Sequence, residues 1–136
     1  MKMVKAGLAY WAFIFGLGFI LGTIRTLWLA PLLNSATLAV LIELPFMLIA
    51  SWFAARTFVA HWSLEMLSER LAMGGIGFAL LMASEAFLGI VLMGDSVGDW
   101  LAGLVAIPGI IGLAGQLLFA IFPAMVGKKD QSPLPA

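Results

Sequence analysis

The sequence predicts an all-α integral membrane protein, a bundle of four antiparallel transmembrane helices with both termini in the cytoplasm. Three observations predict this class. The chain of 136 residues is 63% hydrophobic and only 10% charged, with a mean hydropathy of +1.12. It contains four long apolar segments, and its basic residues gather on one side of the arrangement that these segments imply. A soluble domain of this size would expose the same surface and aggregate, so lipid is the expected solvent.

The apolar segments are expected to form spans at residues 7–31, 36–59, 71–93 and 100–125. An α-helix rises about 1.5 Å per residue, so about 20 residues cross the roughly 30 Å of hydrocarbon in a bilayer. Together they make one domain, residues 1–127. The polar stretch 128–136 contains two prolines and is expected to be a disordered cytoplasmic tail.

Turn-forming residues separate the segments. Pro31 and Asn34 end the first segment, and Gly94 and Gly98 precede the fourth. Both connections are short, so successive helices should run in opposite directions. The middle connection, residues 61–70, is longer and polar.

The positions of lysine and arginine set the expected orientation. They precede the first segment, flank the middle connection and follow the last segment: Lys2, Lys5, Arg56, Arg70, Lys128 and Lys129. The other two connections carry no basic residue. By the positive-inside rule, both termini and the middle connection are cytoplasmic, which fits a multi-pass protein of the bacterial inner membrane. The alternative is a signal peptide in the first segment, but that segment is long for one and contains Arg25.

Three ionisable side chains, Arg25, Glu43 and Glu85, lie inside the apolar segments. A charge near the bilayer centre costs about 2.5 to 3.5 kcal/mol even on lenient insertion scales, so such a residue usually has a partner. In the expected topology each of the three lies roughly 9 to 12 Å below the outer surface. We therefore expect an intramembrane charge cluster in which the guanidinium and the two carboxylates offset one another's lost hydration.

Small residues beside Arg25 predict close helix packing. Gly18, Gly22 and Arg25 share one face of the first helix. A small residue at every fourth position lets the backbone of another helix approach closely. The same stripe should therefore pack against a neighbouring helix and present the arginine to the interior.

Two prolines and a glutamine are further candidates for shaping the bundle. Pro45 removes an amide donor near Glu43, so it either bends the second helix at a site of function or is an ordinary membrane kink. Pro108, Gly112 and Gln116 recur at fourfold spacing in the fourth segment. Gln116 is expected nearer the cytoplasmic side, and a lone glutamine in a span usually makes an interhelical hydrogen bond.

Several function classes find no support in the sequence. The chain has no cysteine and one histidine, which excludes thiolate metal sites and leaves little for an imidazole site. It shows neither a glycine-rich phosphate loop nor a serine, histidine and acid at plausible spacing. We therefore expect no catalytic residue, no metal and no cofactor, and the chain is not expected to be an enzyme. The net charge of zero and the lack of a basic stripe argue against nucleic acid.

Short motifs resemble known families. The stretch GFILGTIRTLW, residues 18–28, resembles the glycine-rich first helix, ending in arginine, of the small four-helix fluoride channels. That family's second-helix asparagine and its third-helix break with paired phenylalanines have no counterpart here. Small multidrug exporters are similar in having four spans and a membrane glutamate, but theirs lies in the first helix.

The overall pattern resembles a family of uncharacterised small four-helix bacterial inner-membrane proteins. These proteins have GTIR followed by a proline, ELP in the second span and a glutamate in the third, as this chain does. The resemblance implies the four-helix fold and the membrane location, and it supplies no activity.

Two hypotheses for function remain. In the preferred one, the chain is an accessory or structural subunit whose Arg25, Glu43 and Glu85 form a polar clasp, and it works as a homo-oligomer or within a larger membrane complex. In the alternative, it is a small homo-oligomeric transporter or channel for ions or a proton-coupled solute that uses the membrane glutamates. Transporters usually show broken helices or a more polar lining. Four helices are also expected to leave almost no interior for a pore, so conduction would need a subunit interface.

Overall fold

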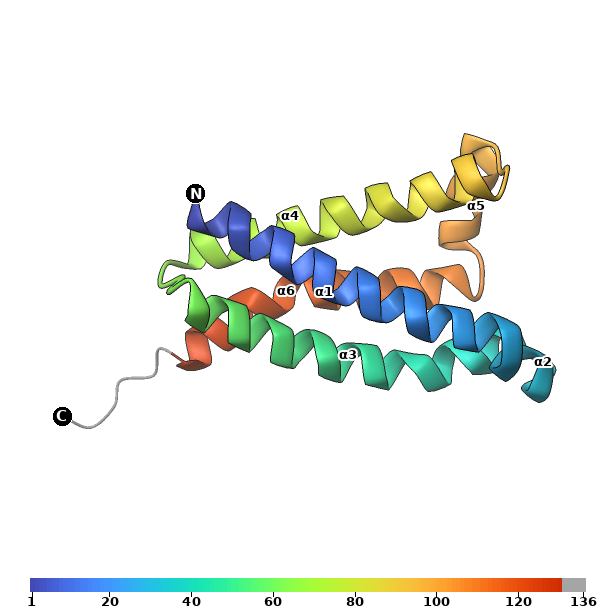
Figure 1. Cartoon of the computed structure of the whole chain (residues 1–136), viewed down its shortest axis with the longest axis horizontal. Helices are drawn as coiled ribbons and strands as arrows, with labels where there is room; N and C mark the ends of the chain where they lie inside the picture. The colour runs from blue at the N-terminus through green and yellow to red at the C-terminus, as the bar shows by residue number, and fades with distance from the viewer. Residues whose placement is uncertain (131–136) are drawn as a thin grey trace.

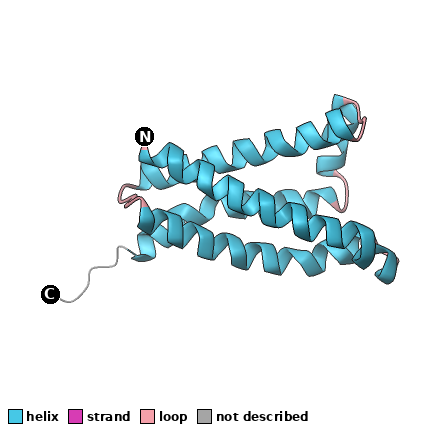
Figure 2. Cartoon of the chain, in the orientation of Figure 1, coloured by secondary structure: helices cyan, strands magenta, loops and turns pink. Residues whose placement is uncertain are grey.

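The computed structural model describes residues 1–130, which fold into helices joined by short turns (Figure 2). The elements in chain order are α1 (Lys2–Ile24), η1 (Arg25–Leu29), α2 (Ala30–Leu33), α3 (Ala36–His61), α4 (Leu67–Ala86), η2 (Phe87–Leu92), α5 (Val97–Val105) and α6 (Gly109–Asp130). The segments η1 and η2 are π-helical turns that continue α1 and α4 without a break. This architecture confirms the predicted all-α class.

Four stretches are long and apolar enough to span a membrane. They are Lys2–Leu33, Ala36–His61, Leu67–Leu92 and Gly109–Val126. Only a minority of the residues in each stretch is buried inside the bundle, and many exposed side chains are large and apolar, such as Phe19, Phe46 and Phe53. Such a surface suits hydrocarbon, and an α-helix satisfies its own backbone hydrogen bonds there. The prediction of four helices able to span a membrane is therefore confirmed.

The bundle has two distinct ends (Figure 1). The N-terminus and the connection between α3 and α4 lie at one end, which we call the N-terminal end, and α2 and α5 lie at the other, the α5 end. A contact fixes the N-terminal end, because Lys2 Nζ donates to the carbonyl of Ser63 at 3.0 Å and lies 3.7 Å from Glu69 Oε2. Arg70, only 3% exposed, donates from Nη1 to the carbonyls of the same connection at Leu64 and Glu65.

The core lies toward the N-terminal end. Helix α1 packs against α3 and α4, and α6 packs against the same two helices. Tyr10 of α1 stacks on Phe119 of α6 with ring centroids 4.0 Å apart, and its hydroxyl donates to the Phe119 carbonyl at 2.6 Å. Other buried members of this core include Ala6, Ala55, Val59, Met73, Phe122 and Val126. The four helices are thus closely packed over this part of their length.

The fourth predicted span, residues 100–125, needs correction. Residues 100–105 belong to α5, and the long helix α6 begins only at Gly109. Between them Ala106 is extended, with φ −97° and ψ 155°. Pro108 lacks an amide hydrogen and disfavours a helical conformation at the residue before it, so it separates two helices instead of kinking one.

The end of α6 also bears on the predicted tail. The helix continues to Asp130, so residues 128–130, which were expected to be disordered, are helical. The remaining part of the predicted tail, residues 131–136, lies outside the described residues.

Close backbone packing occurs at Gly74. A Cβ atom at this position of α4 would overlap the backbone carbonyl of Ala120 on α6. The face of α1 that carries Gly18 and Gly22 was also predicted to let another backbone approach closely, but its neighbours are side chains. A Cβ at Gly18 would lie 3.4 Å from the Met47 side chain, and one at Gly22 would lie 3.3 Å from Arg25 Nη2. The expectation of a backbone neighbour there was wrong, because these glycines leave room for side chains.

We predict that Gly74→Ala destabilises the bundle while Gly75→Ala does not. The added methyl group at position 74 has to displace α6, and overpacking of this kind costs about 1 to 3 kcal/mol of unfolding free energy. Gly75 is the matched control, since no atom lies within 4 Å of the position that its added methyl group would take. Thermal unfolding in detergent micelles measures both. Equal melting temperatures for the two variants would contradict the packing described for α4 and α6.

Candidate functional site

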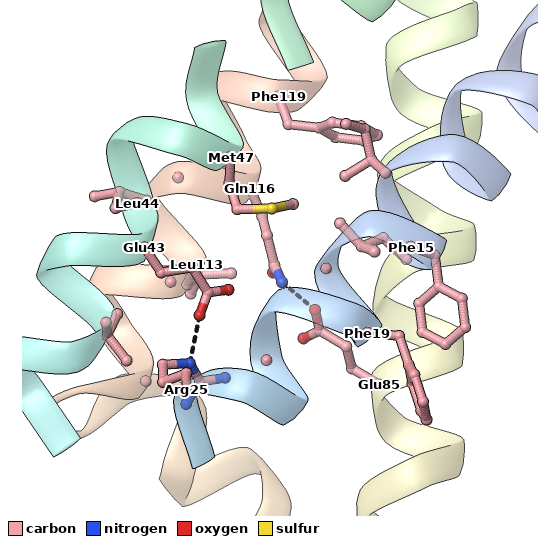
Figure 3. Close-up of a pocket in the computed structure, with 18 of the residues that line it drawn as sticks. Phe15, Phe19, Arg25, Glu43, Leu44, Met47, Glu85, Leu113, Gln116 and Phe119 are labelled. Atoms are coloured by element: carbon pink, nitrogen blue, oxygen red, sulfur yellow. Dashed lines mark hydrogen bonds and ion pairs between the residues drawn. The ribbon is translucent and has the colours of Figure 1, made fainter. Parts of the chain in front are cut away.

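A cavity of about 650 Å³ lies among the four long helices, in the half of the bundle nearer the α5 end. Its walls come from the second half of α1 with η1, the first half of α3, the end of α4 and the start of α6 (Figure 3). Four helices therefore leave more interior in this half of the bundle than expected, while the lack of room for a pore through the chain stays a prediction. Gly18, Gly22 and Gly112 all face this space, and their missing side chains help to create it.

An ion pair joins the first and second spans at this level. Arg25 opens η1 and Glu43 lies on α3, and Arg25 Nε donates to Glu43 Oε2 at 2.5 Å. The Arg25 side chain is 31% exposed and that of Glu43 16% exposed. A short charge-assisted hydrogen bond between opposite charges offsets part of their lost hydration. The guanidinium fits because Gly22, one turn earlier, has no side chain to occupy its place.

A second polar pair joins the third and fourth long helices. Gln116 on α6 donates from Nε2 to Glu85 Oε2 on α4 (Figure 3). The other amide atom, Gln116 Oε1, is buried and has no hydrogen-bond partner among residues 1–126, whose side chains the structure describes. Within the same described residues, Glu85 has no basic partner. The expected three-membered cluster is thus corrected to two pairs, Arg25 with Glu43 and Glu85 with Gln116, that line one cavity.

The position of Gln116 follows from the true start of its helix. Gln116 lies seven residues after Gly109, about 10 Å along α6. Glu43 lies seven residues after the first residue of α3, Glu85 seven before the last of η2, and Arg25 eight before the last of α2. All four polar side chains therefore lie at a similar distance from the α5 end, whereas Gln116 had been expected nearer the opposite side.

The remaining predicted residues divide between the cavity and the helix scaffold. Gly18, Pro108 and Gly112 line the cavity, and no atom lies within 4 Å of the position that a Gly112 Cβ would take. Pro45 does not line it, and α3 continues through this proline from Ala36 to His61.

Most of the lining was not identified from the sequence. It is apolar and aromatic, and it includes Phe15, Phe19, Leu44, Met47, Leu113 and Phe119 (Figure 3). Side chains of this kind fill every span, so composition does not separate those that face a cavity from those that face lipid. Ser51, which is 2% exposed, also lines the cavity. Its spacing from Glu43 and Met47, four residues at each step, is the signal that could have placed it on the same helix face.

Comparison with known proteins adds no relative, since no family model, no curated protein and no solved structure matches this chain. Among the described side chains, residues 1–126, no group of three or more histidine, aspartate or glutamate residues is placed to hold a metal ion. The chemistry of the cavity therefore has to be argued from its own residues. A largely apolar space of several hundred Å³ with a few convergent polar groups is the usual form of a small-molecule site.

We predict that the Arg25–Glu43 pair is energetically coupled. Arg25→Met or Glu43→Gln alone leaves the other charged group unpaired in the membrane, so each should lower the unfolding free energy by about 1 to 3 kcal/mol. The double variant should lose less than the sum of the two. Denaturant titration in mixed micelles gives the four free energies of the cycle.

The matched control is the cycle of Arg25→Met with Glu85→Gln, because no hydrogen bond or ion pair joins those two side chains within the described residues. Its coupling should be smaller than that of Arg25 with Glu43. Strict additivity for Arg25 and Glu43 would show that the ion pair does not form in the folded protein.

Proposed function

We propose that this chain is a small multi-pass membrane carrier that binds a solute in the cavity at the level of its four polar side chains. The observation that carries this proposal is the cavity itself, whose volume of about 650 Å³ lies within the range of small-ligand sites. Its polar groups lie inside predicted spans, where ionisable residues usually mark a solute or ion pathway.

The two ends of the bundle support a carrier more than an open channel. Toward the N-terminal end, the Tyr10–Phe119 stack and the surrounding core fill the space between the helices. Toward the α5 end, the helices surround the cavity without sealing it, and the Arg25 side chain on its wall is partly exposed. We therefore propose that the cavity is reached from the α5 end, as the site of a carrier is reached from one side of the membrane in each of its two states.

The proposed topology follows from the basic residues. Lys2 and Arg70 lie at the N-terminal end of the bundle, with the connection that both contact. By the positive-inside rule this end is cytoplasmic, the four spans are antiparallel, both termini are inside, and the cavity faces the outer side of a bacterial inner membrane.

A second candidate function is the accessory subunit with a polar clasp. The specific observation in its favour is that each polar pair joins two helices, Arg25–Glu43 linking η1 to α3 and Gln116–Glu85 linking α6 to α4. In this case the pairs fix helix register, and the apolar exterior binds a second copy or another membrane protein in addition to lipid.

Thiol labelling tests the carrier proposal, and the absence of native cysteine makes single-cysteine variants clean. We predict that Gly112→Cys, which places the thiol in the cavity, reacts with a membrane-impermeant methanethiosulfonate added outside intact spheroplasts. The control is Ala114→Cys, at nearly the same depth on α6 but exposed outside the cavity lining, where lipid should protect it.

Each other labelling result has a defined meaning. Protection of both thiols would show that water does not reach the cavity from outside, which contradicts the proposed carrier state. Reaction of Gly112→Cys only from the cytoplasmic side of inverted vesicles would contradict the proposed topology.

Purification in mild detergent separates the two candidate functions. A carrier is expected to purify alone or as a homo-oligomer, and Arg25→Ala should not change what accompanies it. A stoichiometric second membrane protein that is lost on Arg25→Ala would instead support the accessory subunit and contradict the carrier.

A further inference from the structure

The charges on the cavity wall do not balance. Its charged lining residues are Arg25, Glu43 and Glu85, and the first two neutralise each other in an ion pair. When Glu85 is ionised, the wall therefore carries one net negative charge. A charge held inside a membrane is unfavourable without a counter-charge, so this cavity favours a monovalent cation over an anion or a neutral solute.

The hydrogen bonds beside Glu85 indicate what kind of cation fits. An ionised carboxylate only accepts hydrogen bonds, so its contact with Gln116 orients the amide with Nε2 toward Glu85 and leaves Oε1 as an acceptor. That Oε1 is buried and has no donor among residues 1–126, whose side chains the structure describes. A cation with N–H groups can donate to Gln116 Oε1 while its charge faces Glu85. A quaternary ammonium has no N–H group and cannot make this bond.

The volume and the apolar lining of the cavity indicate what the uncharged part of the ligand is like. The space of about 650 Å³ is far larger than a bare metal ion, and most of its wall is apolar. Hard cations take several oxygen ligands, commonly carboxylates, whereas this wall offers two carboxylates, one of them already paired with Arg25, and otherwise only the neutral side-chain oxygens of Thr23, Thr26, Ser51 and Gln116. Phe15, Phe19 and Phe119 line the same space and suit a hydrocarbon or aromatic body.

We infer that the cavity binds the ammonium group of an amphipathic primary or secondary amine, with Glu85 as its counter-ion, Gln116 Oε1 as a hydrogen-bond acceptor and the apolar wall around its body. This inference rests on the proposed function of the cavity as a solute site. The same chemistry is offered by a free amphipathic amine and by the ethanolamine headgroup of a phospholipid, and the experiment distinguishes these two sources.

The test compares three probes of equal chain length, hexylammonium, hexyltrimethylammonium and hexanoate. Each is titrated into the full-length protein in phosphatidylglycerol nanodiscs, with empty nanodiscs subtracted, and binding is measured by isothermal titration calorimetry. We expect hexylammonium to bind about 10- to 100-fold more tightly than the quaternary analogue, the factor that one hydrogen bond to a charged group supplies. Hexanoate should not bind above the empty-nanodisc level.

Two variants assign the binding to the proposed atoms. Glu85→Gln removes the counter-charge and should weaken hexylammonium binding by about 10- to 100-fold. Asp99→Asn, which removes an exposed carboxylate at the α5 end outside the cavity lining, is the matched control and should bind as the wild type does. Gln116→Leu should abolish the preference for hexylammonium over its trimethyl analogue, a selectivity change that a merely weakened fold would not produce.

The lipid source is tested by repeating the hexylammonium titration in nanodiscs that contain phosphatidylethanolamine. Weaker apparent binding there shows that the lipid headgroup competes for the site, and unchanged binding identifies a free amine as the ligand. Both results support ammonium recognition.

Three outcomes overturn the inference. They are no hexylammonium binding above empty nanodiscs, equal binding of the primary and quaternary ions, and binding that Glu85→Gln leaves unchanged. The carrier proposal is judged separately, because the labelling of Gly112→Cys depends on access to the cavity and not on which solute it binds.

Discussion

The pairing of polar side chains inside lipid is the constraint on which the rest of this structure depends. An α-helix already satisfies its own backbone hydrogen bonds in a membrane, so the side chains are left to specify how helices meet. Here Arg25 pairs with Glu43 and Gln116 donates to Glu85, and each bond joins a different two of the four long helices. The four residues meet at one level because each lies seven or eight residues from the α5 end of its span.

The two halves of the bundle have different packing and therefore different possible roles. In the half toward the N-terminal end, Tyr10 and Phe119 stack and Gly74 lets α4 approach the α6 backbone at Ala120. In the other half, Gly112 faces open space and Gly22 accommodates the Arg25 guanidinium. A packed half gives the stability that allows the other half to keep a cavity with charged groups in it, since unfilled volume and buried charge both destabilise a fold.

The parts of this structure that depend on local sequence could be predicted. Long apolar runs identify helices able to span a membrane, and the high cost of a charge in lipid singles out Arg25, Glu43 and Glu85 as residues that line an interior. The partner of Glu85 could not be predicted in the same way, because it depends on where α6 begins. Pro108 starts that helix nine residues later than the expected residue 100, and this moves Gln116 to the level of Glu85.

The cavity and its apolar wall were beyond sequence reasoning for a different reason. In a soluble protein, hydrophobic periodicity separates the interior face of a helix from the exterior, but in a membrane both faces are apolar. Phe15 and Phe19 on the cavity wall and Phe46 on the exposed surface look alike in the sequence. The spacing of Gly18 and Gly22 likewise marks a helix face with small residues without telling whether a backbone or an arginine side chain will occupy the space.

Solid-state NMR in lipid bilayers tests the central claim most directly, through dipolar coupling between labelled arginine side-chain nitrogen and labelled glutamate carboxyl carbon. The Arg25 side chain, identified as the signal that Arg25→Met removes, should show a strong coupling that corresponds to roughly 4 Å or less, as expected across a hydrogen bond. Glu43→Gln should remove this coupling and Glu85→Gln should retain it. A missing coupling in the wild-type protein, or one that disappears in Glu85→Gln and persists in Glu43→Gln, would contradict the account.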